Sequence, residues 1–546
     1  MLIDARTLAP EKTLEADICI VGAGVAGIGF AKEFMGTKTR LCLLESGGAR
    51  PDRETQSLYW GQNIGLPYYE LDKSRARFLG GTSHFWHIPI GKNQLGVRLR
   101  GHDPIDFEKR DWVPYSGWPF GISELEPYYR KAHDLCQIGA YSYRPADWMS
   151  AEHRHPVHFT GPNLDTTIFH FGNREIFFKD YLDQLERSDN IKVFTHANCV
   201  NIDASENAQT VKKLDVACLN GLTFHVEAKA YILAAGGIEV PRLLLLSNQV
   251  QKEGLGNGSD CVGRFFMEHP HLWSGTFIPA NPHISNTTGL YKIYRVGDVP
   301  VMGKLTLKAE TLRKERLLNY TVSIHPNFAL SYKFHASKFP PGVHSAMELR
   351  SALKAREMPD GFFRHSLNVV KDFRKVVAAA IGRPYVSFQK DYAAGKQIIV
   401  YRLNHMAEQH PNPESRVMLD DEKDALGQNR IKLRWKLTAQ DIDSMIRSQR
   451  IIDQDLRRNG LGRLSIDMEG TQPPEDIHGG WHHMGTTRMH VDPKWGVVDA
   501  HCRVHGISNL FIAGSSVFPT GGYANPVLTT LALTIRLADH IKNFLK

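Results

Sequence analysis

Cysteine is scarce in this sequence. Only seven cysteines occur among 546 residues, and no two of them stand at C-x-x-C spacing. Cys19, Cys42 and Cys199 fall inside apolar runs that are typical of strands. We therefore expect reduced core thiols in a reducing compartment, and neither disulfides nor a metal cluster.

Long apolar runs are missing as well. None reaches the roughly 18 apolar residues of a membrane-spanning helix. Asp4, Arg6, Glu11 and Lys12 also interrupt the N-terminal stretch, which a signal peptide would keep apolar. We therefore expect no integral membrane segment and a cytoplasmic protein.

The excess of positive charge is small. The 66 basic residues exceed the 58 acidic ones by a net charge of +8, and they are scattered along the chain. No nucleic-acid-binding motif accompanies them, so we expect no nucleic-acid partner. With 42% apolar and 23% charged residues, the chain has the composition of a globular protein that is long enough for two or more cores.

The clearest pattern present is the stretch Ala16–Gly29, ADICIVGAGVAGIG. Its β-branched run Ile18–Val21 predicts a buried parallel strand, and Gly22, Gly24 and Gly27 follow at the spacing G-x-G-x-x-G. In such a fingerprint the first glycine permits a tight turn and the second lets the backbone approach a pyrophosphate. The third lets the following helix lie close to the strand.

A second predicted strand, Arg40–Leu44, ends on Glu45. A carboxylate at this position can accept hydrogen bonds from the ribose hydroxyls of an adenosine. Because an acidic side chain disfavours a phosphorylated ribose, the pattern predicts FAD or NAD rather than NADP.

The C-terminal quarter carries a second group of signals. Gly479–Met489 reads GGWHHMGTTRM, Asn509–Gly514 is a predicted strand, and Thr520–Ala532 is a glycine turn that opens a helix. The start of such a helix offers free N–H groups to an anion or a polar ring edge. Two sites of this kind, one at each end of the chain, predict a single cofactor held from both sides.

The intervening sequence predicts further elements. Asn220-Gly221 is a strong hairpin signal. Ser123 is a candidate N-cap, with Glu126 three residues later. The aromatic stretch Leu79–Ile90 suggests a core loop on composition alone.

The expected elements are strands over Ile191–Ile202, Asp215–Leu222, Thr223–Val226, Ala230–Ala235, Val301–Leu307, Asn319–Ile324, Ile398–Leu403 and Ile431–Leu437, and helices over Ile238–Ser247, Val343–Ala380 (an arm) and Thr438–Asn459.

Together these stretches resemble the glucose-methanol-choline (GMC) oxidoreductases, FAD enzymes that oxidise alcohols. The motifs that carry the resemblance are LGGTS at 79–83, AAGGIEVPRLLLLS at 234–247, VGRFFMEHP at 262–270, HHMGTTRM and GYANP. The pattern H-x-x-G-T-x-R-M followed by A-N-P is most similar to the branch of pyranose oxidases and bacterial sugar dehydrogenases. The resemblance implies an α/β fold in which a Rossmann-like FAD-binding domain is intertwined with an α+β substrate-binding domain.

The resemblance also implies site residues. His482 takes the place of the family's catalytic histidine and Asn525 that of its partner, whereas His483 matches no catalytic position. The implied cofactor-binding residues are Gly22, Gly24, Gly27, Glu45, Gly80, Gly81, Thr82, Ser83, Val200, Gly236, Gly514, Ser515, Asn525 and Pro526.

One departure from the family concerns how the flavin is attached. Several members bind FAD covalently through a histidine five residues after the first glycine of the GG-x-S segment, and that position is Phe85 here. His84 is one place short, and in a strand a shift of one residue turns a side chain to the opposite face. We therefore expect non-covalent FAD.

The chemistry assigned to these residues follows from their side chains. Oxidation of an alcohol needs a hydride acceptor and a group that takes the hydroxyl proton, and an imidazole suits the second task. A neighbouring amide can donate a hydrogen bond to the same oxygen. These side chains suit the oxidation of an alcohol, and the resemblance to pyranose oxidases and sugar dehydrogenases implies that His482 and Asn525 serve oxidation of a secondary hydroxyl of a sugar or glycoside to the ketone.

Three alternatives are left open or disfavoured. A sterol or another non-sugar alcohol is the alternative substrate, and a flavin-fold binding subunit is the alternative that is not an enzyme. A metal centre at His482-His483 or at His269 and His271 is not expected, because adjacent histidines on a strand point to opposite faces and no acidic or cysteine ligand stands at a recognised spacing.

The expected domains are discontinuous. The FAD-binding domain takes 1–90, 191–275 and 480–546, and the substrate-binding domain takes 91–190 and 276–479, including the arm 343–380. In the arm, Val369–Ile381 is amphipathic. Such a helix more often packs on its own domain than on a membrane or a partner, and our hypothesis is that it covers the site entrance or a subunit interface, so a homo-oligomer is left open. The electron acceptor is also left open between oxygen, a quinone and a partner protein.

Overall fold

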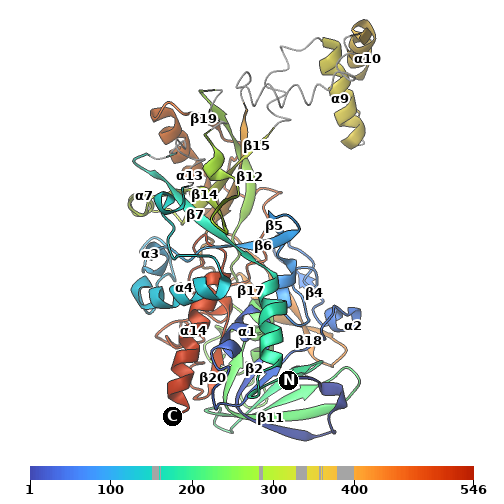
Figure 1. Ribbon diagram of the computed structural model, residues 1–546, viewed down its shortest axis with the longest axis vertical. Helices are drawn as coiled ribbons and strands as arrows, with labels where there is room; N and C mark the ends of the chain where they lie inside the picture. Colours follow the sequence, from blue (N-terminus) through green and yellow to red (C-terminus); the bar gives the residue numbers. More distant parts are fainter. Residues whose placement is uncertain are drawn as a thin grey trace.

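Two large β-sheets organise the molecule in the computed structural model (Figure 1). The structure describes residues 1–149, 159, 161–281, 284, 287–327, 341–355, 358–359, 361–374, 376–377 and 399–546. Each sheet covers a hydrophobic core of its own, and the larger core includes most of the apolar residues at the two ends of the chain.

The first sheet has eight strands and contains the N-terminal fingerprint. Its order is β1-β8-β3-β2-β11-β10-β9, and β20 pairs with β11. The strands next to β2 run parallel to it, as the sequence predicts for a buried run. The bounds are β1 Leu2–Asp4, β2 Lys12–Val21, β3 Leu41–Leu44, β8 Ile191–Thr195, β9 Asn198–Ala204, β10 Val211–Ala217, β11 Thr223–Leu233 and β20 Leu510–Ile512.

The hairpin predicted at Asn220-Gly221 is confirmed. β10 and β11 are antiparallel with Ala217 opposite Thr223, and Gly221 has a φ of +87° in the turn. The separation of Thr223–Val226 from Ala230–Ala235 is wrong, because both belong to the continuous strand β11. The intervening polar residues stay in strand conformation since the whole segment pairs with β2.

Helices flank this sheet and pack on one another. α1 contacts α14, and α14 contacts α4. Helix α6 begins two residues before the predicted start, and its Pro241 occupies the early turns. The bounds are α1 Val25–Lys32, α2 Arg53–Ser57, α4 Ile122–Cys136, η5 Ile176–Tyr181, α5 Leu182–Glu186, α6 Gly236–Leu246, η9 Ser515–Val517 and α14 Val527–Phe544.

The second sheet has nine strands in the order β19-β12-β16-β15-β14-β7-β6-β5, with β13 paired to β14. It lies above the first sheet in Figure 1 and is antiparallel throughout its registered pairs. The bounds are β5 Ile88–Gly91, β6 Gln94–Leu99, β7 Leu164–Asn173, β12 His271–Pro279, β13 Tyr294–Val296, β14 Val299–Leu307, β15 Tyr320–Pro326, β16 Tyr401–Ala407 and β19 Gly462–Ser465.

A small third sheet joins distant parts of the chain. β4 (Gly61–Asn63) pairs in parallel with β18 (Asn429–Arg434), which also pairs with β17 (Arg416–Lys423). The long amphipathic helix is confirmed as α13 (Ala439–Arg458), with Thr438 and Asp441 forming a capping box. The remaining elements are α3 Pro104–Phe107, α7 Ala309–Glu315, η1 Ala5–Thr7, η3 Pro145–Trp148 and η7 Gly289–Tyr291.

Two local predictions differ from the structure. α4 begins at Ile122 with Gly121 as N-cap, so the assignment of Ser123 as N-cap is wrong, and the capping box of this region precedes α3 instead. The segment Gly81–Phe85 is a 3-10 helix (η2) and not a strand. Its first residues have positive φ angles, which favour a turn of helix over an extended chain.

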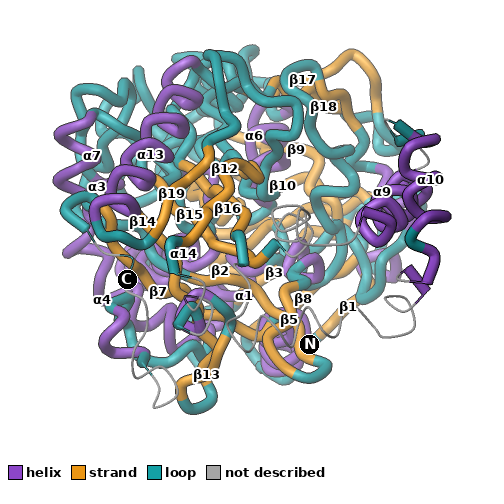
Figure 2. Tube along the Cα trace, turned by 90° about the horizontal axis from the view of Figure 1, so that it is seen from above, coloured by secondary structure: helices purple, strands orange, loops and turns teal. Residues whose placement is uncertain are grey.

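The arm contains two helices that pack on each other, α9 (Pro341–Ala355) and α10 (Phe362–Lys371). They stand apart from the two sheets at the upper right of Figure 1 and at the right of Figure 2. The expected C-terminal end of this arm, 378–381, lies outside the described residues, as does the start of the strand expected from Ile398. No helix in the described ranges has the length and apolarity to cross a bilayer.

Candidate active site

One cavity connects the two ends of the chain. It has a volume of about 550 Å³, and both the N-terminal glycine loop and the C-terminal histidine segment line it. The first turn of α1 contributes Val25 and Ala26, and the start of α14 contributes Asn525, Pro526 and Val527. The two helix starts that the sequence singled out therefore face one cavity.

The glycine loop shows why each glycine is needed. Gly22 has a φ of +106°, and a Cβ atom there would lie 2.7 Å from the carbonyl oxygen of Ala234. A Cβ at Gly27 would lie 1.9 Å from the carbonyl oxygen of Gly22, so only glycine lets α1 approach the strand. A Cβ at Gly24 would meet nothing within 4 Å, which leaves the backbone open toward the cavity.

Glu45 closes the end of β3. Its carboxylate accepts hydrogen bonds from the backbone N–H groups of Ala23 (3.0 Å) and Gly47 (2.9 Å), and the residue lines the cavity. Burial raises the pKa of Glu45, although these two N–H groups oppose the shift. The carboxylate is thus held by the glycine loop itself.

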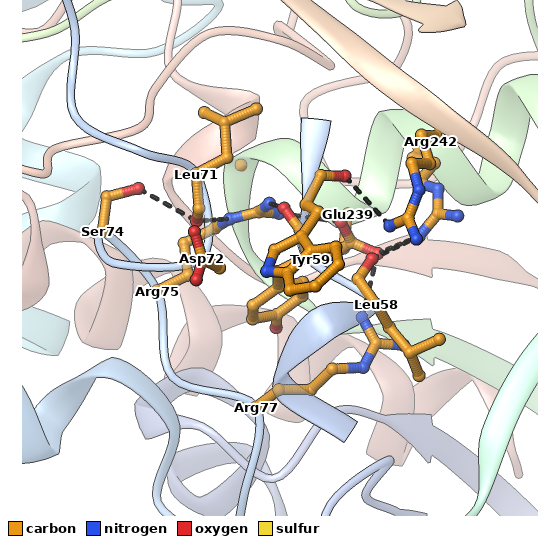
Figure 3. A network of polar contacts seen from close by, with 12 residues as sticks. Leu58, Tyr59, Leu71, Asp72, Ser74, Arg75, Arg77, Glu239 and Arg242 are labelled. Carbon is orange, nitrogen blue, oxygen red and sulfur yellow. Dashed lines mark hydrogen bonds and ion pairs between the residues drawn. The ribbon is translucent and has the colours of Figure 1, made fainter. Parts of the chain in front are cut away.

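A network of arginines around Glu239 borders the same cavity (Figure 3). Arg75 donates to Glu239 Oε1 at 2.7 Å, and Arg77 and Arg242 each donate to Oε2 at 3.2 Å. The guanidinium of Arg75 also lies 4.0 Å from the ring centre of Tyr59. Burial alone would raise the pKa of Glu239, but the three arginines outweigh it and lower the pKa to about 2.

His482 is the centre of a chain of hydrogen bonds. Its Nε2 atom lies 2.9 Å from Asn525 Nδ2, and its Nδ1 atom lies 2.8 Å from His269 Nδ1. His269 Nε2 is in turn 3.1 Å from the carbonyl oxygen of Gly521. Both His482 and Asn525 line the cavity.

These partners determine the tautomer of His482. A carbonyl oxygen only accepts, so His269 carries its proton on Nε2 and presents a lone pair on Nδ1. His482 therefore donates from Nδ1, and its Nε2 lone pair accepts from the amide of Asn525. Burial and the nearby His269 and His271 lower the pKa of His482, so the ring stays neutral near pH 7 with an available base at Nε2.

Glu268 fixes the backbone of the histidine segment. Its Oε2 atom accepts from the N–H groups of Gly480 and His482, each at 2.9 Å, and its Oε1 atom accepts from the Tyr68 hydroxyl. Tyr68 also lies 3.0 Å from His483 Nε2. Burial raises the pKa of Glu268 to about 7, against the hydrogen bonds that favour its charged form.

Comparisons with known proteins support the resemblance seen in the sequence. A family model described as GMC oxidoreductase matches residues 411–534. The fructose dehydrogenase large subunit of Gluconobacter japonicus is 28% identical to this chain over 98% of it and 99% of the relative. The C-terminal region therefore matches the GMC oxidoreductases, and the similarity to a sugar dehydrogenase extends along the chain.

Two further proteins are similar to this chain over nearly its whole length. The 6'''-hydroxyparomomycin C oxidase of Streptomyces lividus is 29% identical, with 97% of this chain and 92% of that one covered. The crystal structure of pyridoxine 4-oxidase from Mesorbium loti superposes with a TM-score of 0.56 at 18% identity, over 97% of this chain and 99% of that chain. The structural similarity shows a shared GMC fold.

GMC flavoenzymes use FAD, and the cavity of this protein fits that cofactor. Gly24 and the start of α1 offer open backbone for a pyrophosphate, and Glu45 lies at the end of β3, where a ribose is bound in such folds. The start of α14 and His482 lie at the same cavity, where a flavin ring would meet a substrate.

The cavity wall holds most of the residues that the GMC resemblance implied. Three of the implied residues do not line the cavity: Gly27, Gly80 and Val200. Cys199, the neighbour of Val200 in β9, lines it instead. The implied residues that line the cavity are Gly22, Gly24, Glu45, Gly81, Thr82, Ser83, Gly236, His482, Gly514, Ser515, Asn525 and Pro526.

The aromatic stretch after β4 borders the cavity and is not a core loop. Phe85, Trp86 and His87 line the cavity, and the Trp481 ring lies 5.6 Å from Phe85 and 5.5 Å from Tyr69. Composition could not reveal that these side chains line a cavity, because Phe85 contacts Trp481, which is more than 390 residues away in the sequence.

Sequence reasoning missed two residues of the site. His269 was considered only as a metal ligand, and Glu268 was not considered at all, although both stand in the quoted motif VGRFFMEHP. Within the described part of the chain, no group of three or more His, Cys, Asp or Glu residues could hold a metal ion. His269 instead contacts His482.

Proposed function

We propose that this protein oxidises a secondary hydroxyl of a sugar or glycoside to the ketone. The observation that carries the proposal is the pair His482 Nε2 and Asn525 Nδ2, 2.9 Å apart in the wall of the cavity that also contains the glycine loop. The names of the relatives, a fructose dehydrogenase subunit and an oxidase of a hydroxylated aminoglycoside, support a sugar hydroxyl.

Each residue has a defined task. FAD, when bound, supplies the acceptor for the hydride that leaves the carbinol carbon. His482 accepts the hydroxyl proton at Nε2, and Asn525 donates from Nδ2 to the same oxygen as negative charge grows there. Because these two atoms bond each other in the free protein, the alcohol inserts between them and satisfies both.

The cavity wall favours a hydroxyl-rich substrate over a sterol. Trp481 and Tyr69 offer flat apolar faces, whereas His271, His478 and Arg98 add polar groups to the same wall. A sterol would leave these polar groups without partners, at a cost in binding free energy.

The FAD in this proposal is not covalently attached. Phe85 lines the cavity, whereas His84 stacks on Phe178 at 4.0 Å and lies 2.9 Å from the Leu79 carbonyl oxygen through Nε2. Acid precipitation should therefore leave the yellow colour in the supernatant. Colour that stays with the pellet would identify a covalent link.

We also propose the discontinuous domains 1–90, 191–275 and 480–546 for FAD and 91–190 and 276–479 for substrate. The eight-stranded sheet takes its strands from the first set, and β14, β15 and β16 come from the second. β5 and β12 begin within the first set but pair in the other sheet, which supports boundaries nearer to 87 and 270. Cytoplasmic location and the electron acceptor stay predictions.

The arm is proposed to cover the entrance or to contact a second copy. Phe363 and Val370 on α10 are 83% and 74% exposed, and Phe373 is 62% exposed. Deletion of the arm should change either the mass in solution or the apparent affinity for substrate. If both stay unchanged, this role is refuted.

Anaerobic reduction of the flavin tests the function. The purified yellow protein is mixed with a panel of sugars and glycosides, and the loss of flavin absorbance is followed without oxygen. We expect at least one sugar to bleach the flavin and to yield a ketone. Bleaching by apolar alcohols alone would contradict the proposal.

A further inference from the structure

Two basic side chains, buried Lys304 and half-buried Arg98, lie beside the active site without an acidic partner in the described residues. Lys304, in the middle of β14, is 0% exposed, and its Nζ atom has no hydrogen-bond partner within the described residues. Arg98 on β6 lines the cavity. Its Nε atom is buried and has no hydrogen-bond partner among the residues that the structure describes. Burial lowers the pKa of Lys304, and the positive charge of Arg98 lowers it further.

The strand register places both cations on one face of the nine-stranded sheet. Arg98 is opposite Phe171, and Lys304 is opposite Thr167. Phe171, Phe169 and Thr167 alternate along β7 and therefore point to the same face. Lys304 Nζ lies 4.9 Å from the ring centre of Phe169, which confirms that its side chain follows this face.

The same side of the cavity contains His271 and His482. The His271 ring lies 6.1 Å from the His482 ring, and its buried Nε2 atom is without a partner in the described ranges. Arg98, His271 and His482 all line this cavity. The positive charge of Arg98 also contributes to the lowered pKa of His482, after burial and the two neighbouring histidines His269 and His271.

Most buried arginines of this interior have an acidic partner, although Arg488 donates only to the Tyr115 carbonyl oxygen. Arg110 is bonded to Glu408 at 2.5 and 2.8 Å, and Arg242 is bonded to Asp424 at 2.6 Å. Burial of a charge without a partner is costly, and such groups persist where a function requires them. A negatively charged group on a bound molecule would supply the missing partner.

We propose that the substrate is an alcohol that also carries a carboxylate, of the class of uronic acids and their glycosides. Its carboxylate faces Arg98, with Lys304 behind, while a ring hydroxyl faces His482. The planar guanidinium offers parallel N–H donors that match a carboxylate. This inference rests on the proposed function for the chemistry, but the binding of the anion does not depend on turnover.

The first test compares matched substrates in the holoenzyme. Methyl glucuronides and methyl glucosides of the same ring configuration differ only in the carboxylate, and anaerobic bleaching of the flavin gives a second-order rate constant for each. We expect the anionic member to react about 10- to 100-fold faster, and Lys304→Met and Arg98→Gln to abolish this preference. Lys192→Met on β8, an exposed residue in the other sheet, is the control for net charge.

Several outcomes would overturn the inference. The neutral glycoside could react as fast as the anionic one, or the preference could survive both substitutions. A shift in the kinetic pKa of the base without a change of preference would mean that the cations only keep His482 neutral. If no alcohol bleaches the flavin, the proposed function fails. The binding of a carboxylate to Arg98 and Lys304 is then tested by the oxalate titration alone.

The second test measures binding of oxalate, which has no C–H bond to oxidise, by titration calorimetry of the holoenzyme. Lys304→Met should weaken oxalate binding about 10- to 100-fold, and Lys192→Met should not change it. Absence of oxalate binding to the native protein, or tighter binding of inorganic phosphate, would refute the carboxylate.

Thermal unfolding provides an independent readout. Lys304→Met should raise the unfolding midpoint because it removes a buried basic group without a partner, whereas Arg110→Met should lower it because Glu408 loses its partner. Equal destabilisation by both would show that Lys304 is already paired in the fold.

Discussion

Replacement of His269 by leucine removes the acceptor that holds the proton of His482 on Nδ1. His269 Nδ1 lies 2.8 Å from His482 Nδ1, and the Gly521 carbonyl oxygen fixes the proton of His269 on Nε2. Without this acceptor, His482 can carry its proton on Nε2 instead. Asn525 Oδ1 has no partner in the described part of the protein. After rotation of the amide, this oxygen can accept a hydrogen bond from the Nε2–H group of His482.

The magnitude follows from one hydrogen bond. His482 becomes positively charged as it takes the hydroxyl proton, and the bond from its Nδ1–H to His269 is then a hydrogen bond from a charged group, which contributes about 1.5–3 kcal/mol. A change of about 2 kcal/mol corresponds to a rate about 30-fold lower. His269→Asn should lose far less, because its Oδ1 atom can occupy the place of the imidazole Nδ1 and accept from His482.

The assay is stopped-flow reduction of the flavin without oxygen, at saturating concentrations of the best substrate of the panel. FAD content and substrate affinity should stay close to those of the native protein in both variants, because His269 lies behind His482 and is not among the residues that line the cavity. The reasoning is refuted if His269→Leu reduces its flavin at the native rate, or if His269→Asn is as slow as His269→Leu.

Further predictions concern stability. Arg110→Met should lower the free energy of unfolding by about 3–5 kcal/mol, because it leaves Glu408 buried and unpaired. Urea denaturation measures the free energy of unfolding, and a loss below about 1 kcal/mol would contradict the prediction. Acid should also destabilise the fold. Burial lowers the pKa of His133 and His483 to about 3 and that of His269 to about 4. Below the unfolded histidine pKa of about 6.5 the unfolded chain therefore takes up protons that the folded chain does not, and the free energy of unfolding falls. The opposite effect of Glu268, whose pKa is raised to about 7, is outnumbered, and a melting temperature that stays constant or rises from pH 7 to pH 5 would be the contrary result.

Patterns of local sequence predicted the elements that depend on local sequence. The glycine fingerprint, the hairpin at Asn220-Gly221 and the long helix expected over Thr438–Asn459 each depend on neighbouring residues, and all three appear as expected. The continuity of β11 was missed because pairing with β2, far away in the sequence, decides it.

The site shows the same limit. His482 and Asn525 are recognisable from the motifs around them, and the structure brings them together. The contact of His269 with His482 depends on the bridge between Met267 and Met484, which places two distant segments side by side. The lack of partners for Lys304 is likewise a property of packing, since no local pattern tells whether a lysine in a strand faces water, a carboxylate or a cavity.

The most direct test of the account is the rate of anaerobic flavin reduction in His482→Ala beside His483→Ala. His482→Ala should retain FAD and lose about 10²–10⁴-fold in rate, because it removes the base at Nε2. Asn525→Ala should slow the same step by less, and the double variant should lose less than the product of both effects, since the two groups serve one oxygen. His483, which lies 3.0 Å from the Tyr68 hydroxyl, should tolerate replacement far better. Flavin reduction that is abolished by His483→Ala and nearly unchanged in His482→Ala would contradict the account.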